Sequence, residues 1–330
     1  MKTQYANAVT QYENGTSLGG RIIKEGGLVV FPTETVYGLG ANGLNSEAVL
    51  KIFAAKGRPA DNPLILHIAK KSELKPLWSH VPDNARILAD TFWPGPLTMI
   101  FNRSSIVPDE VTAGLDTVAV RMPLNKTARA LINAAGVPIA APSANLSGKP
   151  SPTTAEHVRQ DMDGRVDLII DGGPCKYGLE STVVSLIGRP TILRPGAVTK
   201  EMLEAMIGPV DVAHAVLSPL REGETAASPG MKYRHYAPDA EVVVAEGRER
   251  EIAAKICREY DAREAAGEDC IIFATKQTQP FYRGRNCVII GDRTEPATLC
   301  ASLFYSLREY GGRADVIFAE ALPNDDMGLA

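Results

Sequence analysis

Residues 139–151 read IAAPSANLSGKPS, and this stretch decides how the rest of the chain is interpreted. A short apolar run, Ile139 to Ala141, gives way to a loop of small residues with hydroxyl and amide side chains. Such a loop at the end of a buried strand exposes backbone N–H donors, which suit phosphate groups. A solvated turn is an equally good interpretation of this one segment.

Two cations, Lys56 and Arg58, follow an amphipathic stretch at residues 46–55. A lysine at the negative end of a helix explains Lys56 but not Arg58. A guanidinium can hold two phosphate oxygens in a planar fork, while an ammonium acts as a mobile point charge. The pair therefore predicts a phosphate-binding site, completed by Ser143 and Asn145. Since the sequence holds no Gly-x-x-x-x-Gly-Lys-[Ser/Thr], a P-loop is excluded.

The first 217 residues alternate short β-branched runs with amphipathic segments, which is typical of an α/β fold. Several strand-like runs lie too close together for a helical crossover, so a mixed sheet is expected. Residues 32–40 are predicted to form a polar loop with two glycines. The alternating segments are 27–31, 46–55, 64–69, 83–92, 97–101, 117–122, 125–135, 137–141, 154–162, 166–170 and 181–187.

The 330-residue chain is long enough for two domains. Residues 218–240, rich in Ser, Pro, Gly and Ala, predict a linker between a catalytic domain at 1–217 and a second domain at 241–330. The second domain has the strand and helix pattern of a small Rossmann-like unit, without the glycine-rich turn of a cofactor site. Residues 231–236 carry two aromatic and three basic or imidazole side chains, so this part of the linker is expected to dock onto the first domain.

The charge distribution argues against tight binding of a nucleic acid through its phosphate backbone. The chain has 39 acidic and 35 basic residues, of which 16 acidic and 11 basic residues lie in 241–330. Residues 1–240 are therefore close to neutral. Proteins that bind the phosphate backbone need a basic excess, and only weak or no direct RNA binding is therefore expected.

The cysteines and apolar stretches indicate a cytoplasmic protein. Five cysteines at wide spacings, with no Cys-x-x-Cys pair, predict reduced thiols. The scattered histidines and cysteines do not predict zinc, and no carboxylate cluster predicts a protein-held metal. No stretch has the length of a signal peptide or a membrane span.

Eight motifs in order resemble the YrdC family, in the long two-domain form of the threonylcarbamoyl-AMP synthases. They are PTETVYGLG (32–40), KGRPADNPLILHI (56–68), FWPGPLT (92–98), TAGLDTVAVRMP (112–123), APSANLSGKPSPT (141–153), GLESTVV (178–184), LRPG (193–196) and SPGMKYRHYAP (228–238). The resemblance implies a twisted, open mixed sheet followed by a Rossmann-like domain.

The resemblance also implies a reaction. L-threonine, bicarbonate and ATP would give L-threonylcarbamoyladenylate and pyrophosphate, for a downstream tRNA threonylcarbamoyl transferase complex that modifies position 37 of tRNA. Magnesium would be carried on the triphosphate. No covalent enzyme intermediate is needed, which agrees with the absence of a defensible Ser-His-Asp or Cys-His pattern. Catalysis then depends on positioning and charge.

The family pattern assigns the site residues. The catalytic signature residues are Lys56, Arg58, Ser143 and Asn145. The further residues on the ATP side are Asn62, Thr117, Ser151, Arg194 and Tyr236. The threonine side is formed by Thr35, His67, Arg121, Ser181 and the backbone of Ala141.

Some of these residues have a simpler structural interpretation. Arg194 before Pro-Gly can simply end a strand, and His67 can be an edge residue of its apolar run. Arg121 can make a two-point bond to the substrate carboxylate. Glu34 and Glu180 can bind either substrate or backbone N–H groups.

Two other functions fit parts of the sequence. An RNA-binding module would use the concave face of the sheet, but the near-neutral charge counts against it. A carbamoyl transferase of hydrogenase maturation shares YrdC-like elements. Such proteins carry zinc-finger-like cysteine pairs and an acylphosphatase-like part, and neither is visible in this sequence.

Overall fold

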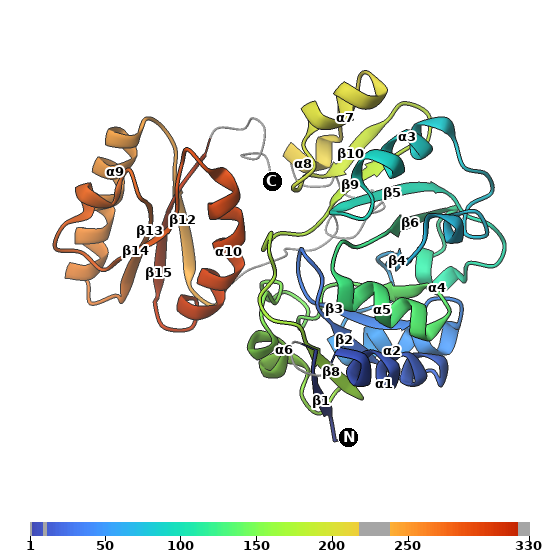
Figure 1. Ribbon diagram of the computed structural model, residues 1–330. Helices are drawn as coiled ribbons and strands as arrows, with labels where there is room; N and C mark the ends of the chain where they lie inside the picture. Colours follow the sequence, from blue (N-terminus) through green and yellow to red (C-terminus); the bar gives the residue numbers. More distant parts are fainter. Residues whose placement is uncertain (1, 9–11, 218–237, 323–330) are drawn as a thin grey trace.

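The computed structural model describes residues 2–8, 12–217 and 238–322. Figure 1 shows two α/β units: an N-terminal unit at 2–217, built on a large sheet, and a C-terminal unit at 238–322, built on a small one. Most of the predicted linker at 218–240, including Tyr236 and residues 231–236, lies outside the described residues.

The N-terminal unit contains an eleven-stranded sheet with the order β1-β8-β2-β3-β7-β4-β6-β5-β9-β10-β11. Its strands are β1 (Gln4–Asn7), β2 (Val29–Phe31), β3 (Gly38–Asn42), β4 (Ile65–His67), β5 (Leu97–Asn102), β6 (Thr117–Arg121), β7 (Ile139–Ala141), β8 (Leu168–Asp171), β9 (Thr182–Ser185), β10 (Thr191–Arg194) and β11 (Asp211–Val212).

The pairing within this sheet is mixed, as predicted. Parallel pairs such as β4 with β6 and β5 with β9 occur beside antiparallel pairs such as β4 with β7 and β5 with β6. Short segments join the antiparallel neighbours β2 with β3 and β9 with β10, whereas the parallel neighbours are joined by longer crossovers. The predicted α/β class and mixed sheet are confirmed.

Helices bury both faces of the sheet. Val29 and Phe31 of β2 pack into one apolar cluster with residues of α1 and α5, while Val30 packs into the other with residues of α2 and α6. This alternation follows from the two-residue period of a strand. The helical segments of the unit are α1 (Tyr12–Lys24), α2 (Ser46–Lys56), η1 (Lys71–Leu74), α3 (Asp83–Phe92), α4 (Asp109–Thr112), α5 (Lys126–Ala135), α6 (Ala155–Met162), α7 (Lys200–Ile207) and α8 (His214–Leu217).

The predicted loop at 32–40 is wrong at its C-terminal end, because Gly38 to Asn42 form strand β3 between β2 and β7. The two glycines in this segment favour a loop in the sequence, but Gly40 lies within a strand where close packing leaves no room for a side chain. A Cβ atom on Gly40 would lie 2.7 Å from Ile139 Cγ2 and 2.8 Å from the Phe31 ring. The strand therefore requires a residue without a side chain at this point.

The C-terminal unit is a four-stranded, fully parallel sheet with the order β12-β15-β13-β14. Its alternation of strands and helices matches the expected Rossmann-like pattern. The elements are β12 (Glu241–Ala245), α9 (Glu249–Ala265), β13 (Cys270–Thr275), η2 (Gln279–Tyr282), β14 (Cys287–Gly291), α10 (Pro296–Tyr310) and β15 (Val316–Glu320).

Helix α10 faces the N-terminal unit (Figure 1). Val36 and Leu179, from two loops of the N-terminal unit, share an apolar cluster with Phe304 and Leu307 of α10. At Gly178 the chain has φ +68°, and a Cβ atom there would lie 2.4 Å from the carbonyl oxygen of Ala301. The backbones of the two units therefore meet closely at this point, with no room for a side chain at position 178.

The five cysteines form no disulfide, and Cys270 and Cys300 are buried in the core, as expected of reduced thiols. Among the described residues no helix has the length and apolar character needed to cross a membrane.

Candidate active site

One cavity in the N-terminal unit gathers most of the predicted site residues. It has about 700 Å³ of empty space, including its open mouth. Ten predicted residues line it: Thr35, Lys56, Arg58, His67, Arg121, Ala141, Ser143, Asn145, Ser181 and Arg194. Since these residues come from separate strands and loops, the fold itself brings the motifs together.

Lys56 ends helix α2, which begins after the N-cap Asn45 and ends at Gly57, a C-cap with φ 63°. Its ammonium is buried and donates to the carbonyl oxygens of Ser143 and Asn145, both at 2.6 Å. Lys56 is therefore not the mobile charge that the sequence suggested. It is fixed on the backbone of the loop that carries the other two signature residues.

Burial lowers the pKa of Lys56 to about 7, with a further lowering by the charge of Arg58. The nearby carboxylates of Glu180 and Asp161 act in the opposite direction. An ammonium with this pKa loses its proton readily, and an incoming polyanion would hold the proton on.

Arg58 Nη2 donates to the carbonyl oxygen of Asn62 at 2.8 Å, and its guanidinium lies 5.4 Å from the centre of the Phe53 ring. The side chain of Asn62 is fully buried but does not line the cavity. Neither its amide oxygen nor its nitrogen has a hydrogen-bond partner among the described residues. A buried amide in this condition is rare and is consistent with a site for a polar ligand.

Arg121 and His67 end the neighbouring parallel strands β6 and β4, in register with each other. Arg121 Nη2 forms a buried ion pair with Glu34 Oε1 at 2.6 Å, and Arg121 Nε donates to Gly95 O at 3.3 Å. Glu34 accepts one N–H of Nη2 and Gly95 accepts the Nε–H, so the second N–H of Nη2 and both N–H groups of Nη1 are left for the two-point bond to a substrate carboxylate, which stays a prediction. Nη1 has no hydrogen-bond partner within the described ranges.

The two carboxylates left open by the sequence bind protein groups. Glu34 Oε2 accepts from the backbone N–H groups of Leu124 and Asn125 at 2.9 and 3.2 Å. Burial raises the pKa of Glu34, but the charge and hydrogen bond of Arg121 outweigh burial and leave the pKa below its ordinary value. Glu34 is therefore an ionised carboxylate that orients Arg121.

His67 is an uncharged residue of the cavity wall. Burial lowers its pKa to about 3, and the charge of Arg121 adds to this lowering. Its Nδ1 lies 3.1 Å from the carbonyl oxygen of Ile65, which can only accept, so Nδ1 carries the proton. The imidazole is thus neutral at any pH near 7.

Glu180 and Arg194 form the second ion pair of the site, with Nη1 and Oε2 at 2.6 Å. Arg194 Nη2 also donates to Ser181 Oγ at 3.1 Å, and Ser151 Oγ donates to Glu180 Oε1 at 2.9 Å. Ser151 therefore supports Glu180 and does not line the cavity. Arg194 does end strand β10, and it reaches the cavity as well.

The structure does not bring Thr117 to the cavity. Thr117 begins β6 and Arg121 ends it, so at about 3.3 Å per residue the two lie roughly 13 Å apart along the strand. Tyr236 lies outside the described residues. The sequence did not single out other lining residues, of which Thr33, Tyr37, Ser147 and Gly148 belong to quoted motifs. Their position inside those motifs was the only available signal.

The wall of the cavity is electropositive. It contains four basic side chains, those of Lys56, Arg58, Arg121 and Arg194, and one acidic side chain, that of Glu180. Among the described residues no group of three or more His, Cys, Asp or Glu could hold a metal ion. The site is suited to a polyanion with its own counter-ion.

Comparisons with known proteins agree with this geometry. A family model described as Telomere recombination, covering Sua5, YciO and YrdC proteins, matches residues 21–196. A model described as Threonylcarbamoyl-AMP synthase, C-terminal domain, matches residues 198–330. The order of the two matches corresponds to the two α/β units.

Individual relatives cover nearly the whole chain. Threonylcarbamoyl-AMP synthase of Bacillus subtilis is 47% identical over 94% of this chain and 88% of its own length. Threonylcarbamoyl-AMP synthase of Pyrococcus abyssi is 47% identical over 93% of this chain and 89% of its own. The crystal structure of Pyrococcus abyssi Sua5 complexed with L-threonine has a TM-score of 0.91 and 43% identity, and covers 100% of this chain and 95% of that one.

A mixed α/β sheet with an electropositive cavity, followed by a small parallel α/β unit, defines the two-domain members of the YrdC class. The chain belongs to the threonylcarbamoyl-AMP synthase family.

Proposed function

We propose that the cavity binds ATP and L-threonine and makes L-threonylcarbamoyladenylate from them and bicarbonate, releasing pyrophosphate. The observation that carries this proposal is the convergence of Lys56, Arg58, Ser143 and Asn145 in one electropositive cavity of a chain that is 47% identical to threonylcarbamoyl-AMP synthases. The RNA-binding and hydrogenase-maturation alternatives are not retained, since no comparable observation favours them.

The chemistry consists of two bond-forming steps. The threonine amine takes up carbon dioxide from bicarbonate and forms a carbamate, with loss of a proton. A carbamate oxygen then attacks the α-phosphorus of ATP, and the bond from this phosphorus to the bridging oxygen of pyrophosphate breaks. No protein side chain becomes covalently attached, so the protein acts by positioning the two substrates and stabilising charge.

The triphosphate is assigned to the side of the cavity formed by Lys56, Arg58 and the loop from Ser143 to Ser151. The guanidinium and the ammonium supply positive charge. Ser143 and Asn145 supply short polar groups on a loop that Lys56 holds by two hydrogen bonds. Magnesium enters as part of the ATP substrate, because this side of the cavity offers no cluster of carboxylate ligands among the described residues.

Threonine is assigned to the wall formed by the ends of β4 and β6, the loop between β2 and β3, and the residue before β9. Arg121 donates to its carboxylate through Nη1 and the second N–H of Nη2, since Glu34 accepts only one N–H of Nη2. The neutral ring of His67 and the hydroxyls of Thr35 and Ser181 are the groups for its amino group and hydroxyl. The relative of known structure that contains L-threonine supports this class of substrate.

The product would serve N6-threonylcarbamoyladenosine formation at position 37 of tRNA. A downstream transferase complex would take the adenylate and transfer its threonylcarbamoyl group. The near-neutral first 240 residues support weak or no direct tRNA binding. A cytoplasmic location is part of this proposal, because tRNA modification takes place there.

Pyrophosphate release from ATP and bicarbonate, measured with and without L-threonine, tests the proposal. Release should depend on threonine and should be matched by an adenylate seen on reversed-phase chromatography. Omitting bicarbonate from degassed buffer should suppress both signals. Pyrophosphate release that is indifferent to threonine and bicarbonate would contradict the proposed reaction.

A further inference from the structure

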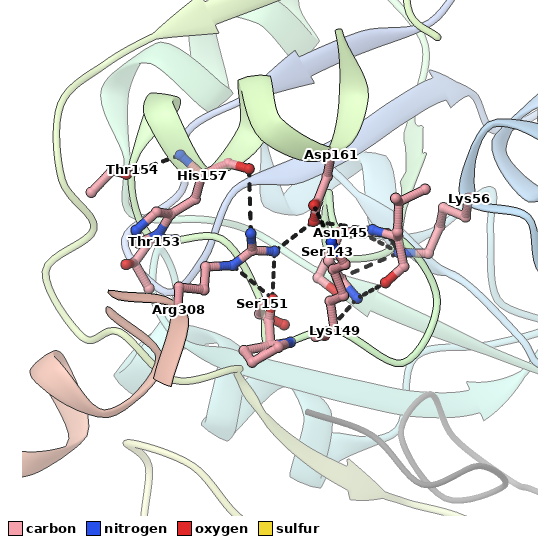
Figure 2. A network of polar contacts seen from close by, with 12 residues as sticks. Lys56, Ser143, Asn145, Lys149, Ser151, Thr153, Thr154, His157, Asp161 and Arg308 are labelled. Carbon is pink, nitrogen blue, oxygen red and sulfur yellow. Dashed lines mark hydrogen bonds and ion pairs between the residues drawn. The ribbon is translucent and has the colours of Figure 1, made fainter. Parts of the chain in front are cut away.

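Arg308 of helix α10 in the C-terminal unit reaches into the N-terminal unit and is buried there (Figure 2). Its Nε and Nη2 donate to the carbonyl oxygen of Pro150 at 2.9 and 2.6 Å. Nη2 also lies 2.6 Å from Asp161 Oδ2, and Nη1 donates to the carbonyl oxygen of His157 at 3.4 Å. All three partners belong to the N-terminal unit.

Asp161, on α6, is the other half of this contact. Its side chain is 0% exposed, and Oδ2 also accepts from the backbone N–H of Leu146 at 3.2 Å. Lys149 Nζ lies 3.8 Å from Oδ1 at the more exposed side. A buried carboxylate of this kind requires a charged partner, and Arg308 supplies one.

The contacts of Arg308 and Asp161 converge on the 143–151 loop. Arg308 holds the carbonyl of Pro150 near the end of the loop, and Asp161 holds the N–H of Leu146 in its middle. On the other side, Lys56 holds the carbonyls of Ser143 and Asn145. Figure 2 shows the loop lying between Lys56 and Arg308.

The loop has one further internal support. Asn145 Nδ2 donates to the carbonyls of Leu146 and Lys149 at 2.8 and 3.0 Å. The position of Asn145 therefore depends on the shape of the whole turn, including the part that Arg308 and Asp161 hold. A displacement at Pro150 or Leu146 would reach the cavity through these two bonds.

We propose that Arg308 is a positioning residue for ATP binding: by holding Pro150 and Asp161 it fixes the 143–151 loop, so the C-terminal unit completes the nucleotide side of a site located in the N-terminal unit. This inference rests on the proposed function for the assignment of the nucleotide side. Arg308 forms no hydrogen bond or ion pair with a described residue that lines the cavity, so its contacts act on the site through the loop, while its charge also helps to lower the pKa of Lys56.

The alternative is that Arg308 only fastens the two units together. The two roles predict different kinetics. If Arg308 only fastens the units, its loss lowers the stability of the protein and changes KM for ATP and KM for threonine to the same extent. If Arg308 positions the loop, its loss raises KM for ATP selectively. Within the described residues neither Arg308 nor Asp161 forms a hydrogen bond or ion pair with the residues assigned to threonine, which are Thr35, His67, Arg121 and Ser181.

The test uses the full chain with Arg308→Gln, which keeps part of the length and some donor capacity of the side chain but removes the charge. The matched control is Arg313→Gln, because Arg313 follows the same helix, is 71% exposed and pairs only with Glu309 within the described residues. Circular dichroism establishes that each variant is folded at the assay temperature. Steady-state pyrophosphate release gives KM for ATP and for threonine separately.

For Arg308→Gln we expect KM for ATP to rise at least about tenfold, since displacement of a positioning loop by a fraction of an ångström is enough for this effect. KM for threonine should change less than about twofold. Arg308→Lys, which can keep the ion pair with Asp161, should restore part of the ATP affinity. Arg313→Gln should behave like the wild type.

A double variant, Arg308→Gln with Asp161→Asn, tests whether the two residues act through one contact. Its effect on KM for ATP should be clearly smaller than the product of the two single effects. Multiplicative effects would show that the residues act independently and would overturn the proposed mechanism.

Two other results would overturn the inference. One is an Arg308→Gln variant with reduced stability but an unchanged KM for ATP, and the other is an equal rise of both KM values. Isothermal titration calorimetry measures ATP binding without turnover. The role of Arg308 can therefore be tested even if the proposed reaction does not take place. If the wild type binds ATP but makes no adenylate, the proposed reaction fails, while the comparison of Arg308→Gln with Arg313→Gln still decides the role of Arg308.

Discussion

The ion pair between Glu34 and Arg121 gives a sharp prediction, because both side chains are at most 5% exposed. In Glu34→Gln the negative charge is lost and Arg121 stays buried without its counter-ion. Two unit charges about 4 Å apart attract by about 4 kcal/mol at an effective dielectric constant of about 20. The amide is cheaper to bury and can still accept from Leu124 and Asn125, so we expect a net loss of about 3 kcal/mol in the free energy of unfolding.

Urea unfolding followed by tryptophan fluorescence measures this loss in the relevant unit. The chain has two tryptophans, Trp78 and Trp93, and both are buried in the N-terminal unit. Their emission therefore reports that unit without a signal from the C-terminal one. With an m value of about 3 kcal/mol/M, the midpoint should fall by about 1 M urea.

The control is Asp90→Asn, which breaks the pair between Lys71 and Asp90 at a similar 2.7 Å but with side chains 41% and 76% exposed. Screening by solvent limits this pair to less than about 1 kcal/mol. The reasoning is refuted if Glu34→Gln costs no more than Asp90→Asn.

The difference in the free energy of unfolding between the wild type and Glu34→Gln should change with pH in a defined direction. The pKa of Glu34 is lowered in the folded protein from its ordinary 4.5, so its contribution to stability is fully present above pH 4.5. It is lost as the pH falls through the folded-state pKa. The gap between wild type and Glu34→Gln should therefore narrow in acid, and a gap that widened there would contradict the assignment.

Four further predictions concern the cavity and the sheet. Arg58→Ala should keep the fold and lose about 2–4 kcal/mol of transition-state stabilisation, measured as kcat/KM for adenylate formation; near wild-type turnover would remove Arg58 from the phosphate site. Since the pKa of Lys56 is about 7, ATP affinity measured by calorimetry from pH 7.5 to 9.5 should fall as the pH rises, by up to about tenfold per pH unit, and a flat profile would exclude Lys56 as the titrating group. In competition assays threonine should be preferred to serine and serine to valine, because valine leaves a buried polar partner unpaired; equal use of valine and serine would rule out recognition of the hydroxyl. Gly40→Ala should lower the urea midpoint, because its Cβ atom would lie within 2.8 Å of Phe31 and Ile139, whereas Gly312→Ala, with open space around it, should not.

Sequence periodicity predicted the elements whose own side chains show a clear helical or strand pattern. The amphipathic stretch at 46–55 became α2, and the β-branched run at 117–122 became β6. Helix α1 was not predicted, since Gly15, Gly19 and Gly20 lower its helix propensity. A Cβ atom on Gly20 would lie 2.6 Å from Ala134 on α5, so tertiary packing decides this helix and local preference does not.

The sequence motifs predicted many of the residues that line the cavity, but not which residues they bind. The motifs identified the basic residues of the cavity, but they could not show that Glu34 binds Arg121, that Glu180 binds Arg194 or that Lys56 is held by backbone carbonyls. These pairings join positions up to 89 residues apart. Arg308 had no signal at all, because its partners Pro150 and Asp161 come from the other unit.

The strand order of the large sheet has a consequence for how the chain is made. Strand β2 pairs on one side with β3, which follows it directly, and on the other with β8, which begins only at Leu168. At about 5–20 residues per second, a ribosome adds the intervening chain in on the order of 10 s. During this time one edge of a fully buried, apolar strand has no neighbour. A strand made late therefore completes the pairing of one made early, and the nascent chain depends on protection from aggregation until β8 has emerged.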